Sequence, residues 1–156
     1  MTTAKIRPAS RDDLAALLEL EGSFPEVDRF DARTWRRLLA GKALTLVHET
    51  PHGINAAAVL LFRAGSPTAR LYSISVATAA RGQGIGLRLL AACEQSAAAR
   101  GATRLRLEVR STNTSAHRLY DGAGYRVIAQ LDSYYPDGEA ALRMQKSLTA
   151  PSDGAP

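Results

Sequence analysis

Residues 71–90 read LYSISVATAARGQGIGLRLL, and the rest of the chain is organised around this stretch. Its apolar start predicts a β-strand that ends at Val76, and its last residues predict a helix entered directly from the glycine-rich loop 81–86. Glycines at a helix start leave a run of backbone N–H groups uncovered, at the positive end of the helix dipole. Such a terminus binds anions, and Arg81 adds a cation to it. We expect the anion to be the pyrophosphate of a cofactor.

The glycine spacing disfavours two common nucleotide-binding loops. A Walker loop ends in Gly-Lys-Ser/Thr, whereas Leu87 and Arg88 follow Gly86 here. A dinucleotide-binding loop has the spacing G-x-G-x-x-G directly after its strand, whereas five residues separate Val76 from the first glycine of this loop. The pattern that remains is Arg-x-x-Gly-x-Gly over residues 81–86.

The length of the chain indicates one domain. A chain of 156 residues can bury roughly 70% of its unfolded surface, and we expect a single domain over residues 1–148 with a disordered tail over 149–156. No apolar run approaches the ~20 residues that span a bilayer, and the first ten residues do not form a signal peptide, so we expect no membrane partner. The single cysteine, Cys93, falls at helical spacing with apolar residues. It predicts a packed core thiol in a cytoplasmic protein.

The charge pattern does not predict a nucleic-acid-binding surface. The net charge is +5, but the arginines are scattered through every predicted element, and no strip of aromatic and basic residues appears. We therefore expect no nucleic-acid partner. His48, His52 and His117 form no cluster with metal-ligand spacing, and we expect no metal.

Apolar periodicity and turn signals predict seven strands and four helices. The strands are expected over residues 5–9, 43–49, 54–63, 70–76, 104–110, 125–131 and 140–147, and the helices over 11–21, 84–100, 113–123 and from Asp31 onward. Ser10 is the expected cap of the first helix. The strand, helix and strand of residues 71–110 form a βαβ unit, which predicts that its two strands are parallel.

This order of elements, together with the loop 81–86, resembles the GNAT family of N-acetyltransferases over nearly the whole chain. Within that family the chain is most similar to the bacterial ribosomal-protein N-terminal (alanine) acetyltransferases. The residues that carry this narrower resemblance are LEVR (107–110), Asn113, Leu119-Tyr120, Gly124-Tyr125 and YYPDGE (134–139). The resemblance implies an α+β fold with α/β/α layers, in which about four helices flank a mixed sheet of six to seven strands. It also implies direct acetyl transfer from acetyl-CoA to an amine in a ternary complex.

The resemblance places the acetyl-CoA site on one strand end, on the glycine loop and on the cap of the last helix. The strand end would contact the pantetheine arm through its backbone, and the loop would hold the pyrophosphate. The residues implied are Ile74, Ser75, Val76, Arg81, Gly82, Gln83, Gly84, Ile85, Gly86, Leu87 and Asn113. For Asn113, helix capping is a sufficient structural explanation on its own.

Glu108 is the candidate base. The alternation of its strand puts Leu105, Leu107 and Val109 on one face and three charged residues, Glu108 among them, on the other. A structural reading is a cross-strand ion pair between Glu108 and an arginine. The family resemblance implies the alternative, a carboxylate that draws the amine proton, directly or through water.

Tyr120 is the candidate general acid. It shares a helix face with Ala116 and Ala123, whose small side chains leave room for another group to approach. A half-buried aromatic residue whose hydroxyl finds a partner is the structural alternative. The resemblance implies that this tyrosine lies near the sulfur of CoA.

The acceptor is the part of the function that the sequence defines least. The resemblance implies that Phe24, Tyr134 and Tyr135 contact it, but two motifs on this side depart from the family pattern. Glu139 is followed by Ala140, where the resembling enzymes carry an aspartate, and Glu26 stands where they tend to carry tryptophan after Phe-Pro. A protein N-terminus, a lysine and a small amine therefore stay open as acceptors, as does a non-catalytic CoA-binding domain. Either a monomer or a homodimer fits the sequence.

Overall fold

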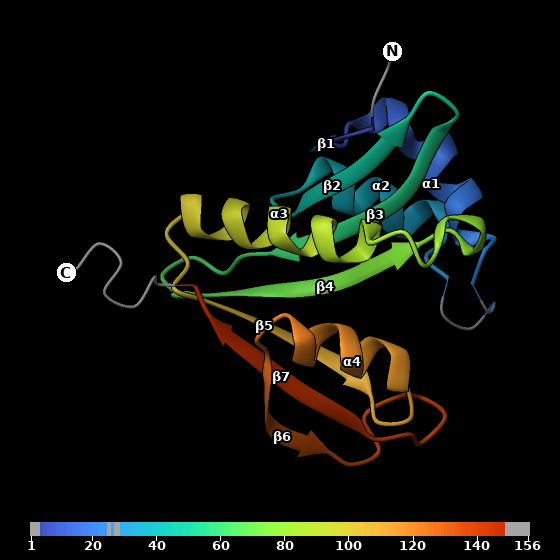
Figure 1. The fold of residues 1–156 in the computed structure, drawn as a ribbon. Helices are drawn as coiled ribbons and strands as arrows, with labels where there is room; N and C mark the ends of the chain where they lie inside the picture. The colour runs from blue at the N-terminus through green and yellow to red at the C-terminus, as the bar shows by residue number, and fades with distance from the viewer. Residues whose placement is uncertain (1–3, 25, 27–28, 149–156) are drawn as a thin grey trace. The chain divides into compact units, whose positions relative to one another are not determined.

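The computed structural model describes residues 4–24, 26 and 29–148 (Figure 1). The hydrogen-bonded order of its seven strands is β1-β2-β3-β4-β5-β7-β6. The chain divides into two compact units, one within residues 1–62 and 71–93 and the other within residues 63–70 and 94–156. The predicted tail 149–156 and Pro25 lie outside the described residues.

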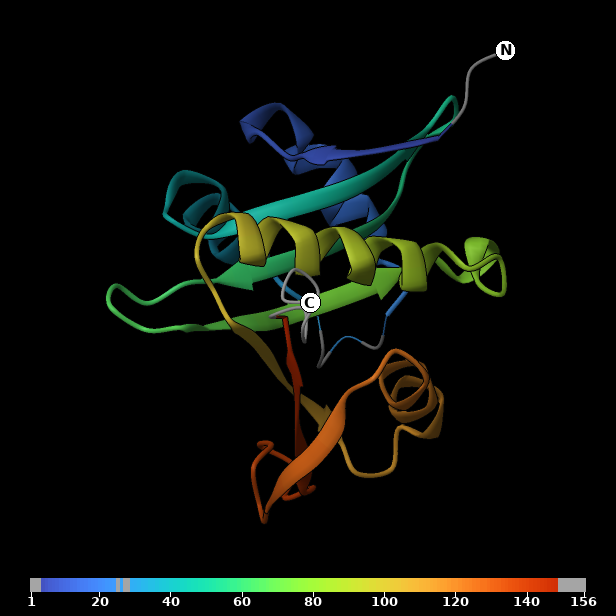
Figure 2. The same cartoon turned by 60° about the vertical axis from the view of Figure 1, so that its left-hand side comes forward.

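The first unit contains an antiparallel arrangement of β1, β2 and β3, with two helices before β2 (Figures 1 and 2). Its elements are β1 (Lys5–Pro8), η1 (Arg11–Asp13), α1 (Leu14–Glu21), α2 (Ala32–Ala40), β2 (Leu44–Thr50), β3 (Gly53–Leu61) and η3 (Thr78–Ala80). It also holds most of β4 (Thr68–Val76) and the first part of α3 (Ile85–Ala99). The predicted hairpin of β2 and β3 is confirmed.

A closed apolar core joins α1 and α2 to β2 and β3. Its fully or nearly fully buried members are Leu17, Leu20, Trp35, Leu38, Val47, Ala57 and Val59. Burying each large member stabilises the unit by about 1.5–3 kcal/mol. The buried carboxylate of Glu21 accepts hydrogen bonds from Trp35 Nε1 at 3.0 Å and from the Phe30 backbone N–H at 2.9 Å. These bonds fix the chain where it returns from α1 toward α2.

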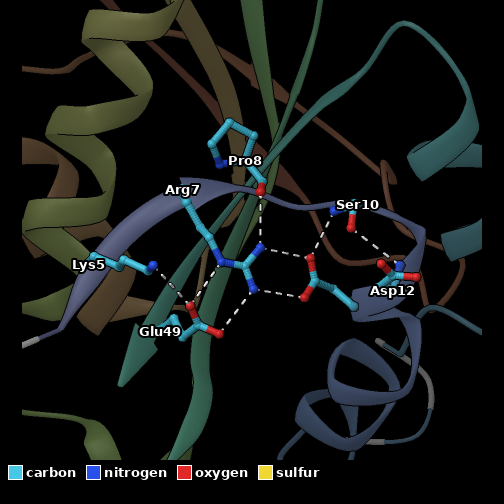
Figure 3. Close-up of polar contacts among 7 residues, drawn as sticks. Lys5, Arg7, Pro8, Ser10, Asp12 and Glu49 are labelled. Carbon is cyan, nitrogen blue, oxygen red and sulfur yellow. Dashed lines mark hydrogen bonds and ion pairs between the residues drawn. The ribbon is translucent and has the colours of Figure 1, made fainter. Parts of the chain in front are cut away.

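Arg7 ties β1 to β2 and to the start of the first helical segment (Figure 3). Its guanidinium has five N–H groups, and the five hydrogen bonds that it donates go to Glu49, Asp13 and the carbonyl oxygen of Pro8. The same Asp13 carboxylate accepts the Ser10 backbone N–H at 2.8 Å. Asp13 and Glu49 both have a lowered pKa, mainly because Arg7 donates to them. We call Arg7, Asp13 and Glu49 the Arg7 cluster.

The first predicted helix is divided into two parts in the structure. Ser10 caps it as predicted, with Oγ accepting from the Asp12 backbone N–H at 3.3 Å. The first turn is a 3₁₀ helix, because Asp13 has φ −90° and ψ 0° rather than α-helical angles. The predicted start of the second helix at Asp31 is confirmed, and Asp31 is its N-cap, since its carboxylate accepts from Thr34 N at 2.8 Å. The predicted core position of Cys93 is also confirmed, with the side chain fully buried.

The second unit is built on a three-stranded antiparallel arrangement in which β7 lies between β5 and β6 (Figures 1 and 2). Its elements are β5 (Arg104–Arg110), α4 (Thr114–Gly122), β6 (Arg126–Leu131) and β7 (Ala141–Ser147). The predicted alternation of β5 is confirmed: Leu105, Leu107 and Val109 are buried, and the charged residues between them are half-buried. This alternation makes one face of β5 polar, and Glu108 lies on it.

No described helix is both long enough and apolar enough to cross a membrane. Among the same residues, no group of three or more His, Cys, Asp or Glu side chains could hold a metal ion.

Candidate functional site

The loop between η3 and α3 has the backbone shape that an anion site requires. Gly82 and Gly84 have φ angles of 81° and 77°, which side-chain-bearing residues rarely adopt. A Cβ placed on either glycine meets no described atom within 4 Å, so the space beside the loop is open. α3 begins at Ile85, and its first N–H groups therefore start within this loop. Binding of a pyrophosphate by this loop stays a prediction.

The side chains of this loop divide into exposed and buried ones. Arg81, Gln83 and Leu87 are exposed, whereas Ile85 is buried and holds the helix start in place. Arg81 Nε donates to the carbonyl oxygen of Val76 at 3.2 Å, which joins the loop to the end of β4. Ile74, Ser75 and Val76 at that strand end are half-buried. The predicted contacts with a cofactor involve main-chain atoms of the loop 81–86 and of the strand end 74–76.

In the second unit, Glu108 lies in a cluster with two arginines. Its Oε1 accepts from Arg70 Nε at 2.9 Å and forms an ion pair with Arg70 Nη2 at 2.7 Å, and its Oε2 accepts from Arg143 Nε at 2.9 Å. The Glu108 side chain is 5% exposed, whereas those of Arg70 and Arg143 are 41% and 32% exposed. Glu108 therefore makes the ion pair that the structural reading anticipated, with two arginines instead of one. We call Glu108, Arg70 and Arg143 the Glu108 cluster.

The loop between β6 and β7 places Tyr134 against this cluster. Arg70 Nη2 donates to the Tyr134 hydroxyl at 3.0 Å, so one guanidinium contacts both Glu108 and Tyr134. The Tyr134 and Tyr135 rings meet edge to face, with centroids 5.0 Å apart. The structure thus brings together Glu108, the candidate base, and Tyr134 and Tyr135, the two candidate acceptor contacts.

Arg110 holds the same loop in place from β5. Its Nη1 donates to Asp137 Oδ2 at 2.9 Å and to Glu139 Oε1 at 3.3 Å, and its guanidinium lies 4.1 Å from the centroid of the Tyr135 ring. Thr112 Oγ1 adds a hydrogen bond to Glu139 at 2.8 Å. Burial raises the pKa of Tyr135, while hydrogen bonding from the Glu139 backbone and from Arg110 lowers that of Asp137. The loop is therefore well supported, although its tip is exposed.

Tyr120 is more deeply buried than the sequence suggests, with 6% of its surface exposed. Its ring meets that of Tyr125 edge to face at 5.9 Å, and the Tyr125 hydroxyl donates to Glu94 Oε2 at 2.8 Å. Lys146 Nζ pairs with the other oxygen of Glu94 at 3.0 Å. This chain of contacts fixes the orientation of the Tyr120 ring from α3 and β7.

Asn113 and Phe24 have structural roles that the described contacts account for. Asn113 Oδ1 caps α4 by accepting from Ala116 N at 3.1 Å. Phe24 is half-buried and packs against the core of the first unit, and its carbonyl oxygen accepts from Arg29 Nε at 2.7 Å. A contact of either residue with a substrate stays a prediction.

Three arginines of the site were missed by the sequence analysis as individual residues. Arg70, Arg143 and Arg110 are distant from one another in the sequence, and the signal that could have located one of them, Arg143, is strand register. In the antiparallel pairing of β5 and β7, Glu108 lies directly opposite Arg143. Opposite charges at paired positions on one sheet face are a recognisable pattern, but it can be read only after the register is known.

The match to known proteins extends across both units. The model of the acetyltransferase (GNAT) family matches residues 14–125, and the chain belongs to this family. The fold is that of the GNAT acetyltransferases, as the sequence predicted: a mixed seven-stranded sheet with four α-helices.

Three proteins to which this chain is similar are named as ribosomal-protein-alanine N-acetyltransferases. A [ribosomal protein bS18]-alanine N-acetyltransferase of Haemophilus ducreyi is 41% identical over 68 residues, which cover 44% of this chain and 47% of that protein. The chain thus matches about half the length of this curated relative. The crystal structure of the ribosomal-protein-S18-alanine N-acetyltransferase from Escherichia coli has a TM-score of 0.84 at 25% identity, over 95% of this chain and 96% of that one. The ribosomal-protein-alanine N-acetyltransferase from Brucella melitensis has a TM-score of 0.78 at 25% identity, over 92% and 99%.

Proposed function

We propose that this protein transfers an acetyl group from acetyl-CoA to the α-amine of a protein N-terminus, by direct transfer in a ternary complex. We further propose that residues 1–148 form one acetyltransferase domain, that the protein acts in the cytoplasm, and that it needs no metal. The observation that carries this proposal is the open, left-handed glycine loop at the start of α3 in a chain of the acetyltransferase (GNAT) family.

The proposed acetyl-CoA site uses the backbone of two segments. The N–H groups of loop 81–86 and of Leu87 would bind the pyrophosphate, with Arg81 as a cation beside it. The strand end 74–76 would pair with the pantetheine arm through main-chain groups, and Asn113 would add a contact from the cap of α4. Acetyl-CoA supplies the activated acyl group, and these residues hold it without covalent chemistry of their own.

Glu108 is proposed to accept the proton of the amine through a water molecule. Its Oε1 accepts from Arg70 Nε and its Oε2 accepts from Arg143 Nε, and a carboxylate offers about four acceptor positions. A path assisted by a single carboxylate suits an α-amine, with an ordinary pKa near 8, better than a lysine near 10.4.

Tyr120 is proposed to return a proton to the departing thiolate. Its ring is held in the second unit by the contact with Tyr125, and a positioned phenol can act as a general acid. Tyr134, Tyr135 and Phe24 are proposed to contact the acceptor, since Tyr134 is exposed and its ring meets that of the half-buried Tyr135, which lies against Arg110.

The deciding experiment measures CoA release from acetyl-CoA with two matched peptides. One peptide has a free α-amine and no lysine, and the other has a blocked N-terminus and one lysine. Turnover confined to the first peptide is the expected result. Turnover confined to the second would overturn the proposed acceptor and would leave the acetyltransferase activity intact.

The non-catalytic alternative predicts that acetyl-CoA binds without turnover on any amine, including small ones. The Tyr120→Phe variant tests the assigned chemistry, because it removes the proton donor and keeps the ring. We expect its kcat to fall about 100-fold with an unchanged affinity for acetyl-CoA. Tyr125→Phe is the matched control, since it removes a neighbouring hydroxyl that bonds to Glu94 instead.

A further inference from the structure

We infer that Arg70 and Arg143 select an acceptor that carries a carboxylate beside its amine, either as the acidic side chain of a first residue or as the α-carboxylate of a free amino acid. This inference rests on the proposed acetyl transfer to an amine. It adds a class of acceptor and two residues that determine specificity.

The first step of the argument is the charge balance of the Glu108 cluster. One carboxylate lies between two guanidiniums, so the cluster has a net charge of +1. The neighbouring arginine on the same face of β5, Arg106, bonds to the neutral side-chain oxygen of Gln145 at 3.1 and 2.9 Å. Among the side chains of Arg70, Arg106, Arg143 and Glu108, positive charge is therefore in excess.

The second step is where that charge is exposed. The negative member, Glu108, is 5% exposed, while about a third or more of each arginine side chain faces solvent. A molecule that approaches the cluster meets guanidinium groups first. Guanidiniums bind carboxylates with two parallel hydrogen bonds, a geometry that an amine or an amide cannot match.

The third step is the position of the cluster relative to the loop between β6 and β7, residues 132–140, which we call the tyrosine loop. Arg70 bonds to the Tyr134 hydroxyl at 3.0 Å, and the Tyr134 and Tyr135 rings are in contact. Arg143 lies opposite Glu108 in the register of β5 and β7. An acceptor that is bound by the tyrosine loop would therefore have its amine and the neighbouring carboxylate close to these two arginines.

A buried carboxylate beside two partly exposed guanidiniums is complementary to an acceptor that has both an amine and a carboxylate. An ammonium alone would be repelled by two exposed guanidiniums, whereas a nearby carboxylate offsets this repulsion and leaves the amine directed at Glu108. The same positive excess lowers the pKa of a bound amine, because a like charge disfavours its protonated form. The cluster thus favours the neutral, nucleophilic amine.

The experiment compares acceptors that differ in one charge. Peptides that begin with Asp or with its isosteric amide Asn are otherwise identical, and a free amino acid is compared with its amide. For the wild-type protein we expect kcat/KM to be about tenfold higher for the acidic member of at least one pair. The pair that shows this preference identifies the source of the carboxylate.

Two variants then test whether the preference for acidic acceptors depends on Arg143. Arg143→Gln should reduce the preference to about twofold or less, mainly through the KM of the acidic acceptor. Arg104→Gln is the matched control, because this arginine lies on the same face of β5 and bonds to Thr68 Oγ1 at 2.7 Å. It should keep the tenfold preference.

Equal rates for acidic and amide acceptors in the wild-type protein would overturn the inference and leave the proposed function standing. Turnover of no amine at all would overturn the proposed function itself. The wild-type comparison needs no substitution, so a variant that fails to fold does not affect it. A preference that survives in a folded Arg143→Gln protein would also contradict the assignment.

Discussion

The protein contains two clusters of arginine and carboxylate that are built in opposite ways. In the Arg7 cluster one guanidinium lies between two carboxylates, and all five of its N–H groups donate within the first unit (Figure 3). In the Glu108 cluster one carboxylate lies between two guanidiniums, which remain substantially exposed. The first arrangement uses all the hydrogen-bonding capacity of its arginine, while the second leaves its cations at the surface.

This difference separates a cluster with a structural role from one that is proposed to act on substrate. The Arg7 cluster joins β1, β2 and the first helical turn, and all five N–H groups of Arg7 donate within it. The Glu108 cluster joins β4, β5, β7 and the tyrosine loop, and its two arginines are partly exposed. We therefore expect substitutions in the Arg7 cluster to change the free energy of unfolding, and substitutions in the Glu108 cluster to change kcat or the choice of acceptor.

The largest expected effect is that of Glu108→Gln on catalysis. The substitution keeps the shape of the side chain but removes the charge that is proposed to accept the proton of the amine. We expect kcat to fall about 100-fold, measured by CoA release with the free α-amine peptide. Asp13→Asn, in the Arg7 cluster, should leave kcat unchanged at temperatures where both variants are folded. If Glu108→Gln lost only thermal stability and kept its rate, the two clusters would not differ in purpose.

The next effect in size is that of Arg7→Leu on stability. It leaves Asp13 and Glu49 without their shared partner, and the carboxylates keep only the backbone bond from Ser10 and the contact with Lys5. We expect the free energy of unfolding to fall by about 2 kcal/mol, measured by urea denaturation at pH 7. Lys5→Leu is the control, since Lys5 lies 3.9 Å from Glu49 and is 67% exposed, and it should cost less than about 0.5 kcal/mol. Equal losses for the two variants would contradict the central role of Arg7.

Local patterns in the sequence were sufficient for most of the fold. The strict alternation over residues 104–110 gave β5 its observed bounds, and the caps at Ser10, Asp31 and Asn113 located the helix starts. Errors arose where tertiary contacts extend or interrupt an element. β4 begins at Thr68, two residues early, where Arg104 bonds to the Thr68 hydroxyl.

In the candidate site, only the loop 81–86, which is proposed to act through its backbone, could be predicted from the sequence. The loop 81–86 is contiguous, so its glycines and its helix start could be read directly from the sequence. The Glu108 cluster joins residues 38 and 35 positions apart, and their pairing depends on how β4, β5 and β7 align. The sequence predicted an arginine partner for Glu108 but could not identify it, because many arginines were available.

A smaller effect is expected in the glycine loop, where main-chain shape rather than side-chain charge matters. Gly82→Ala adds a Cβ at a φ of 81°, in the space that a pyrophosphate would approach. We expect the Kd for acetyl-CoA, measured by calorimetry, to rise about tenfold. Gln83→Ala, at an exposed neighbouring position, should change the Kd by less than about twofold. A larger effect from Gln83 than from Gly82 would mean that side chains, rather than backbone N–H groups, hold the cofactor.

The smallest expected effect is the acid sensitivity of the Arg7 cluster. Arg7 lowers the pKa of Asp13 and of Glu49 in the folded protein, so the unfolded chain binds protons more readily than the folded one. The resulting stabilisation is present above the ordinary carboxyl pKa and disappears as the pH falls through the lowered values. Asp13→Asn should therefore reduce the free energy of unfolding by about 1 kcal/mol at pH 7, and this difference should vanish near pH 2. Asp12→Asn, which changes an exposed neighbour, should show a smaller difference at pH 7. A difference between wild-type protein and Asp13→Asn that stayed constant from pH 7 to pH 2 would mean that Asp13 stabilises the fold as a hydrogen-bond acceptor, independently of its charge.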